Sequence, residues 1–229
     1  ELLLAKIRKY FDRPHPRGQR ATTDAPTFAG DFVFRRKPTE QNHICFALPG
    51  LSLRDERLYA LVVLNNIVGG GMSSRLFQEI REKRGLAYSV YSYHAAHADC
   101  GQFTIYLGTA PTQTKSVLDV WSDTIGELLT GGIHEEEFVH GKEQLKGGFL
   151  MSLESTGNRM NRLGKNELML ENHDSIETTL HKIEAIQKED VDDLMRTMFS
   201  RPFAVACVGE SDQDIQTFRR DQFVISGTN

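Results

Sequence analysis

Arg81 and Tyr88 are the residues whose types and spacing best suit chemistry in this chain. They lie seven positions apart, on either side of Gly85. A guanidinium and a phenolic hydroxyl both donate hydrogen bonds, so together they can stabilise negative charge that develops on a reacting oxygen. The alternative interpretation is structural: Arg81 pairs with Glu79 or Glu82, and Tyr88 packs on a strand.

The residues around this pair predict a helix followed by a strand. We expect Ser73 to cap the helix, whose apolar stripe consists of Leu76, Phe77 and Ile80. Gly85 stands where a residue in the left-handed conformation would end the helix. An aromatic-rich, strand-like run then begins at Tyr88. Arg81 is therefore expected at the edge of the helix's buried face, with Tyr88 just beyond the turn.

Three consecutive glycines, Gly69, Gly70 and Gly71, precede this helix. Glycine-rich backbone ahead of a helix can cradle a phosphate. A phosphate loop, however, needs Gly-Lys followed by Ser or Thr, whereas the residue after these glycines is Met72. We therefore expect the glycines to form a sharp turn between two helices.

Histidines cluster twice, but neither cluster has the spacing of a zinc motif. His94 and His97 lie in strand-like sequence with no glutamate between them. The run from His134 to His140 is best explained by an acidic first helical turn that complements the helix dipole. We therefore expect no metal ligand in this chain. A nucleotide- or metal-binding module built on this run or on the three glycines remains an alternative.

The remaining pattern predicts an α+β fold. The expected strands are a strand pair over 32–36 and 43–48, a strand over 88–93, a strand in which Phe103, Ile105 and Leu107 alternate with polar residues, and 203–208. The expected helices are 54–68, one that Pro111 opens and Gly131-Gly132 closes, a region over 135–170 divided at its glycines (Gly147, Gly148, Gly157 and Gly164), 175–186, 188–198 and 212–220. This order favours a largely antiparallel sheet covered on one face by helices.

Composition is typical of a globular protein that can bury a sizeable core. The 229 residues are 39% hydrophobic and 25% charged, with a formal charge of −4. Acidic and basic residues are interleaved, so we expect no nucleic-acid partner. No uninterrupted apolar stretch reaches the roughly 18 residues of a membrane span, so we expect no membrane partner. Three cysteines, Cys45, Cys100 and Cys207, are best explained as reduced thiols, which favours a cytoplasmic location.

Several segments resemble the C-terminal half of the insulinase-like (pitrilysin-type) zinc metallopeptidases, within the bacterial relatives of mitochondrial processing peptidase. The run from Leu76 to Val90 carries most of the similarity. The other matching segments are Lys37 to Gln41, Glu143 to Gly147, Leu153 to Thr156 and the strand that ends at Val208-Gly209. The resemblance therefore covers nearly the whole chain.

The resemblance implies a zinc-dependent endopeptidase that acts on extended or unfolded peptides. In that family, an arginine and a tyrosine seven residues apart reach from the C-terminal half into the active site; here they are Arg81 and Tyr88. Zinc is bound there by a His-x-x-Glu-His helix of the N-terminal half, a motif that this chain lacks. The resemblance thus implies that zinc is bound by a missing N-terminal half, that this chain alone is inactive, and that the substrate is handled partly by Gly69, Gly70 and Gly71.

The same resemblance implies partners and domain limits. Residues 1–13 are similar to the terminal helix of a preceding half, 14–25 to a linker, and 26–229 to the C-terminal peptidase-family domain. Relatives in this branch work as two-chain assemblies, so we expect a homodimer or a heterodimer in addition to the N-terminal half and the peptide substrate. The alternative function is a non-catalytic partner subunit of a heteromeric processing peptidase.

Overall fold

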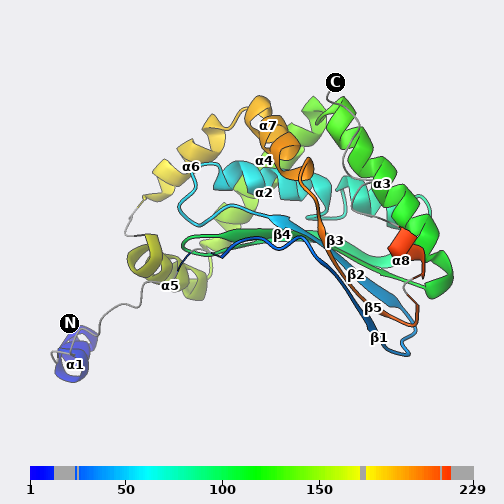
Figure 1. Cartoon of the computed structure of the whole chain (residues 1–229). Helices are drawn as coiled ribbons and strands as arrows, with labels where there is room; N and C mark the ends of the chain where they lie inside the picture. The colour runs from blue at the N-terminus through cyan, green and yellow to red at the C-terminus, as the bar shows by residue number, and fades with distance from the viewer. Residues whose placement is uncertain (13–23, 25, 171–173, 212, 218–229) are drawn as a thin grey trace.

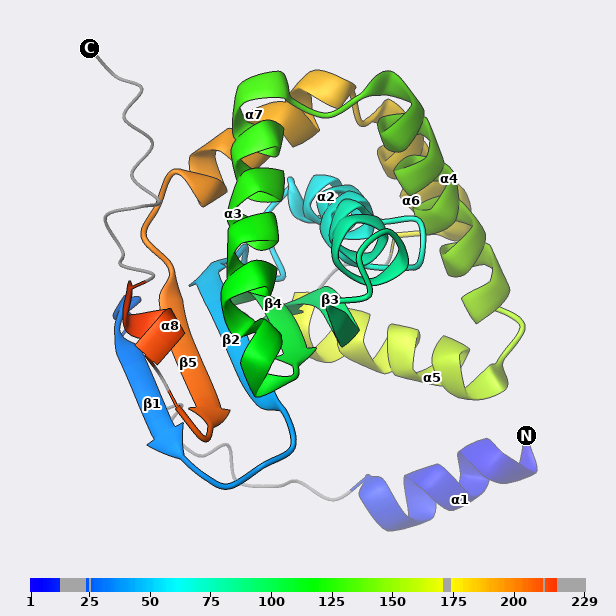
Figure 2. The ribbon, with the colours of Figure 1, turned by 90° about the vertical axis from the view of Figure 1, so that its right-hand side faces the viewer.

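The centre of the molecule is a five-stranded sheet with the strand order β1-β5-β2-β4-β3. The computed structural model describes residues 1–12, 24, 26–170, 174–211 and 213–217. The strands are β1 (Phe32–Arg36), β2 (Asn42–Pro49), β3 (Ala87–Ala96), β4 (Gly101–Thr109) and β5 (Ala204–Gly209). Figure 2 shows β1, β5 and β2 side by side at one end of the sheet.

Helices cover one face of this sheet. The helices of the described residues are α1 (Leu2–Phe11), α2 (Leu58–Val68), α3 (Thr114–Gly131), α4 (Glu135–Ser152), α5 (Thr156–Lys165), α6 (Ile176–Ala185), α7 (Lys188–Phe199) and α8 (Gln213–Thr217). The described residues also form two π-helical turns, η1 (Phe77–Glu82) and η3 (Asn166–Leu170), and a 3-10 turn, η2 (Pro111–Gln113). In Figure 1, α2, α3, α4, α6 and α7 lie over one face, and the middle of the opposite face carries no helix. The predicted α+β architecture is therefore confirmed.

The predicted strand pair between 32–36 and 43–48 is wrong. β1 does not pair with β2, because β5 lies between them. β1 runs parallel to β5, with Phe34 opposite Cys207, and β2 runs antiparallel to β5. The other ladders, β2 with β4 and β3 with β4, are antiparallel. β5, which comes late in the sequence, therefore lies in the sheet between the two earliest strands, β1 and β2.

Two predicted helix boundaries also need correction. The regular part of α2 begins at Leu58 rather than at residue 54, after a turn in which the Asp55 carboxylate accepts hydrogen bonds from the backbone and side chain of Arg57. The region over 135–170 is not divided at Gly147 and Gly148, since α4 runs through both to Ser152. The break comes at Leu153–Ser155, where the Ser155 hydroxyl accepts from the Asn158 amide at 3.3 Å and caps α5.

The core lies between the helices and the sheet, and its aromatic rings stack across both layers. The Phe46 ring of β2 lies 4.1 Å from the Trp121 ring of α3 between centroids, and Phe203 meets both rings edge-on. The apolar residues that recur at helical spacing along α3 are buried: Val117, Leu118, Trp121, Ile125 and Leu128. Helix α3 ends where predicted, with Gly132 at a φ of 73°.

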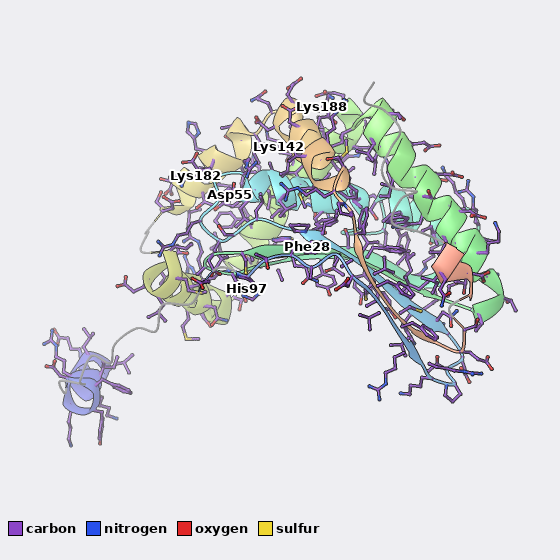
Figure 3. The ribbon with its side chains drawn as sticks, viewed as in Figure 1. Phe28, Asp55, His97, Lys142, Lys182 and Lys188 are labelled. Atoms are coloured by element: carbon purple, nitrogen blue, oxygen red, sulfur yellow. The ribbon has the colours of Figure 1, made fainter. Side chains whose placement is uncertain are left out.

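Lysine side chains connect the helices of this layer through hydrogen bonds to backbone carbonyl groups near helix ends. Lys142 of α4 donates to the carbonyl oxygens of Glu184 and Ile186 at 2.7 and 2.8 Å. Lys188 at the start of α7 donates to the Ile133 carbonyl oxygen at 3.2 Å. Figure 3 shows Lys142 and Lys188 on the helical side of the sheet. These bonds satisfy carbonyl groups that a helix end or a loop would otherwise leave unpaired.

Helix α1 buries none of its residues and lies apart from the sheet and its helices (Figure 1). The predicted linker over 14–25 falls outside the described residues except for Asp24, and the end of the predicted 212–220 helix also falls outside them. Among the residues that the structure describes, no helix is both long enough and apolar enough to cross a membrane.

Candidate functional site

A widened helical turn carries Arg81. The first hydrogen bond of this helix is accepted by the carbonyl oxygen of the buried Ser74, from the Gln78 amide at 3.0 Å, so the predicted cap at Ser73 is one residue too early. Further on, the Lys83 amide donates to the Gln78 carbonyl, five residues back, which defines the π-helical turn η1. Such turns contain one residue more than an α-helical turn and are frequent at functional sites.

Gly85 ends the helix as the sequence predicts. Its φ is 61°, and its amide donates to the Arg81 carbonyl oxygen at 3.0 Å. The Leu86 amide donates to the Ile80 carbonyl oxygen at 2.9 Å. This closure is one residue wider than an ordinary Schellman motif, because the preceding turn is itself wide. The chain then enters β3 directly.

Tyr88 projects outward from a β-bulge. Ala87 pairs with Thr109 and Ser89 pairs with Gly108, so Tyr88 is the extra residue between two consecutive pairs. A bulge interrupts the alternation of side chains and re-aims one of them. As a result Tyr88 is 73% exposed, although its position alternates with those of the buried Val90 and Ser92 and would otherwise point to the same face.

These two local features bring the predicted pair together. The Arg81 guanidinium carbon lies 4.6 Å from the centroid of the Tyr88 ring and 4.8 Å from that of Phe77. Arg81 itself lies at the edge of the buried stripe, with 36% of its side chain exposed. The structure thus confirms the predicted positions and shows one contact that the sequence did not reveal, that between Arg81 and Phe77.

The carboxylates near Arg81 do not neutralise it closely. Glu79 accepts hydrogen bonds from Lys83 and Arg84, and these bonds, that of Lys83 first, lower the pKa of Glu79. Glu82 approaches Arg81 only to 3.9 Å between Oε1 and Nε. Of the two structural partners considered for Arg81, Glu79 is therefore occupied by other cations and Glu82 lies beyond hydrogen-bond distance.

The three glycines form the turn that follows α2, and of the three only Gly69 is buried. The Gly69 and Gly70 amides both donate to the Asn65 carbonyl oxygen, at 3.0 and 2.7 Å. The Gly69 carbonyl oxygen accepts from the Ser92 amide at 2.9 Å, so the loop occupies the outer edge of β3 at this point. A Cβ on Gly69 would lie 2.7 Å from the Ser92 nitrogen, whereas a Cβ on Gly71 would meet only the Gln144 amide nitrogen at 3.2 Å.

The histidine clusters do not form a metal centre in the part of the chain that the structure describes. No group of three or more His, Cys, Asp and Glu side chains lies close enough there to hold a metal ion. At the start of α4, the His134 amide donates to the Glu137 carboxylate at 2.9 Å, an arrangement typical of a helix start. Burial, and secondarily the charge of Lys165, lowers the pKa of His94.

Sequence reasoning missed a row of aromatic rings on the face of the sheet that no helix covers. The Tyr91 and Tyr106 rings stack with centroids 4.8 Å apart, and Tyr93 lies 6.1 Å from Tyr91. Tyr106 also shares a hydrogen bond of 2.6 Å with His43. Tyr91 and Tyr93 are each 45% exposed. Their alternate spacing was visible in the sequence, but the position of Tyr106 beside Tyr91 depends on the register of β3 and β4.

The thiol beside this aromatic row is not activated. Cys45 lies directly across the β2–β4 ladder from Tyr106. Burial raises the pKa of the Cys45 thiol. Burial, with the nearby Tyr91 and Cys45 side chains, likewise raises the pKa of Tyr106. Both groups therefore stay protonated at neutral pH, which argues against a cysteine nucleophile here.

A cavity of about 1070 Å³ lies elsewhere, between the start of α2 and helices α5, α6 and α7. Figure 3 labels two residues that line it, Asp55 and Lys182. Much of its charge is paired locally: Asp55 binds Arg57 at 2.8 Å, and Lys182 binds Asp174 at 2.5 Å. The cavity is large, but these charged side chains bind one another. The Arg81–Tyr88 surface therefore has the chemistry better suited to a functional site.

Comparisons with known proteins agree with this architecture. Residues 1–145 match the family described as "Peptidase M16 inactive domain". The uncharacterised zinc protease YmxG of Bacillus subtilis (strain 168) is 41% identical over 205 residues, which cover 90% of this chain and 50% of that protein. An uncharacterised zinc protease of Streptomyces coelicolor is 42% identical over 194 residues, covering 85% of this chain and 42% of that protein.

A solved structure gives the same result. The crystal structure of a peptidase M16 inactive domain from Pseudomonas fluorescens matches with a TM-score of 0.75 and 25% identity, over 83% of this chain and 46% of that chain. The chain belongs to the peptidase M16 family, which confirms the predicted similarity to the C-terminal half of insulinase-like zinc metallopeptidases. It spans half or less of the length of these two curated relatives.

Proposed function

We propose that this chain is the substrate-orienting half of a zinc-dependent endopeptidase, in which Arg81 and Tyr88 stabilise the transition state of peptide hydrolysis. The observation that carries the proposal is the stacking of Arg81 on Tyr88 at 4.6 Å, with Tyr88 73% exposed. Two donors held together at a surface can bind the carbonyl oxygen of a peptide as that oxygen acquires negative charge. Donors that are already in place need no reorganisation when the charge develops.

The metal belongs to another part of the protein in this proposal. The described residues contain no group that fits a zinc ion, so we derive no step through zinc from this chain. Zinc peptidases use the metal to polarise the scissile carbonyl. Relatives about twice as long as this chain are named zinc proteases, which supports a zinc site in the other half of the parent protein.

The proposed substrate is an extended or unfolded peptide. Strand addition to a sheet edge is one way to bind such a peptide. The sheet has two edge strands, β1 and β3, and the Gly69 carbonyl oxygen already accepts from the Ser92 amide on the edge of β3. We propose that a peptide near Arg81 contacts the glycine loop at Gly71 and the exposed rings of Tyr91 and Tyr93 instead.

The working assembly is proposed to contain this half, the other half of the same protein, and a second chain. Two copies or two different subunits both satisfy this arrangement. Each of the three cysteines, Cys45, Cys100 and Cys207, is a free thiol. Free thiols are usual in a reducing compartment, which supports a cytoplasmic location.

The test is peptide hydrolysis by the full-length parent protein. Arg81→Ala and Tyr88→Phe should each lower kcat by roughly 10²- to 10³-fold, the usual cost of one missing oxyanion donor. Tyr88→Phe keeps the ring that stacks on Arg81 and removes only the hydroxyl. Arg201→Ala, at an exposed arginine before β5, is the control and should leave kcat unchanged. Unchanged kcat in both Arg81→Ala and Tyr88→Phe would show that the assignment is wrong.

A non-catalytic partner subunit is the second candidate. It is favoured by the description of the matching family, an "inactive domain", and by the absence of a zinc-binding group among the described residues. The sequence of the other half of the parent protein separates the two functions. A His-x-x-Glu-His motif in that half supports the peptidase, whereas a similar half without the motif supports the partner subunit.

A further inference from the structure

Phe77 provides the second ring against which Arg81 lies. Its centroid is 4.8 Å from the Arg81 guanidinium carbon, nearly the same separation as that of Tyr88. Phe77 and Arg81 both belong to the π-helical turn η1, so their relative placement is set within one backbone element. The Phe77 ring also packs against the buried core, next to the fully buried Leu76 and Ile80. One side of the arginine is therefore held by a ring that is itself fixed.

Arginine needs such support to act as a preorganised donor. Its side chain has several rotatable bonds, and stacking on an aromatic face restricts the guanidinium plane while leaving its N–H groups free to donate. In the part of the chain that the structure describes, the Arg81 guanidinium donates no hydrogen bond within 3.5 Å, and its nearest carboxylate, Glu82, is 3.9 Å away. The two rings, rather than a hydrogen-bonded carboxylate, therefore restrict the Arg81 guanidinium.

The charges around η1 are arranged consistently with this role. Glu79, one turn before Lys83, accepts from both Lys83 and Arg84. The Glu79 carboxylate therefore binds Lys83 and Arg84 rather than Arg81. The Arg81 charge is therefore left for a ligand, and its position depends on the two rings.

We propose that Phe77 is a positioning residue for Arg81, fixing the guanidinium plane so that its N–H groups face the reacting carbonyl. The inference rests on the proposed function of Arg81. It assigns Phe77 no contact with the substrate. Loss of the ring should therefore lower kcat rather than raise KM, because ground-state peptide binding does not depend on the orientation of one donor.

The experiment uses the full-length parent protein and an unstructured peptide with a quenched fluorophore. Phe77→Leu should lower kcat by about 10-fold to 100-fold, as expected for a misplaced catalytic group, with KM within about twofold of its original value. Phe77→Tyr retains the ring and should keep kcat near its original value. Phe138→Leu is the matched control, since Phe138 also packs in the helical layer beneath a cation, Lys142, at 5.4 Å. It should leave kcat unchanged.

A second measurement separates positioning from a general loss of structure. Guanidinium ion added to Arg81→Ala should partly restore kcat, because both rings remain to hold the ion. The same addition to the double variant of Arg81→Ala with Phe77→Met should restore much less. Methionine is a flexible apolar side chain that fills irregular gaps, so the double variant keeps an apolar contact with the core while it removes the ring.

If Arg81→Ala lowers kcat but Phe77→Leu does not, the positioning role is overturned and the proposed function stands. Equal rescue by guanidinium with and without the Phe77 ring also overturns it. If Arg81→Ala itself leaves kcat unchanged, the proposed function fails, and the role of Phe77 fails with it.

Discussion

The Arg81 guanidinium lies 4.6 Å from the centre of the Tyr88 ring, although a helix end and the start of a strand separate the two residues. Two irregularities of the backbone produce this contact. The wide turn η1 closes on Gly85, and the bulge at Tyr88 turns that side chain out of the regular pleat. A contact that depends on both irregularities is sensitive to either one, and Gly85 controls the first of them.

Replacing Gly85 tests the left-handed helix end. Gly85→Ala should destabilise the protein by about 1 to 2 kcal/mol, because alanine is strained at a φ of 61°. No atom lies within 4 Å of the position of its Cβ, so the cost comes from the backbone alone. Gly85→Asn should cost less, since asparagine tolerates this conformation. Denaturant unfolding of the three proteins measures the differences.

Gly126→Ala is the control for Gly85→Ala. Gly126 lies within α3, and a Cβ there would also meet nothing within 4 Å. Alanine is the better helix former, so this change should stabilise the protein by about 0.5 to 1 kcal/mol. Destabilisation of similar size by both substitutions would contradict the explanation based on φ.

The glycine loop permits a structural role to be separated from substrate handling. Gly69→Ala should destabilise the fold by about 1 to 3 kcal/mol, because the added Cβ would lie 2.7 Å from the Ser92 nitrogen. Gly71→Ala should change stability little, since it meets only the end of the Gln144 side chain at 3.2 Å. If the loop contacts substrate, Gly71→Ala should raise KM of the parent protein at unchanged Tm. An unchanged KM would confine the loop to its structural role.

Acid should weaken the contact between Arg75 and Glu137. Arg75 Nε and Nη2 donate to the Glu137 carboxylate at 2.5 and 2.6 Å, and Arg75 also donates to the Gly132 carbonyl oxygen. Burial opposes ionisation of Glu137, but the Arg75 bonds, the His134 amide and nearby positive charge together lower its pKa. Its stabilising contribution is therefore complete above the ordinary glutamate pKa of about 4.3 and is lost as pH falls through the lower folded value.

This linkage gives a measurable pH dependence. Glu137→Gln should cost about 2 kcal/mol at pH 7, the usual range for hydrogen bonds to charged groups. The difference from the original protein should shrink as pH falls below about 4. Glu135→Gln, in the same first turn but exposed, is the control and should cost at most a few tenths of a kcal/mol. Denaturant midpoints measured between pH 7 and pH 3 give both curves; a constant difference across this range would contradict the assignment.

Local sequence signals were sufficient for most elements. Helix α3 has apolar residues at helical spacing between Pro111 and Gly132, and β4 alternates apolar and polar residues, so each is defined by its own segment. Gly85 was equally readable, because only a residue that adopts positive φ easily ends a helix in that way. These features depend on residues within a few positions of one another.

The misassigned features depend on distant or weak signals. Nothing in 32–48 indicates that β5, more than 150 residues later, separates β1 from β2. Gly147 and Gly148 do not break α4, because a glycine weakens a helix by only about 1 kcal/mol and tertiary contacts outweigh that cost. At the site, the positions of Arg81 and Tyr88 were predictable. The four-residue spacing of Phe77 and Arg81 also permits their contact on a helix, whereas the π-helical turn itself has no clear sequence signature.

Zinc should bind to the parent protein but not to this chain alone. The 229 residues alone should retain no stoichiometric zinc after dialysis and should not cleave unfolded peptides, because the described residues offer no cluster of metal ligands. A chelator should therefore leave the Tm of the chain unchanged, whereas it should abolish peptide cleavage by the parent protein. Zinc content is measured by mass spectrometry, and peptide cleavage is assayed, for the chain and for the parent protein side by side. Zinc-dependent cleavage by this chain alone would contradict the division of labour between the two halves.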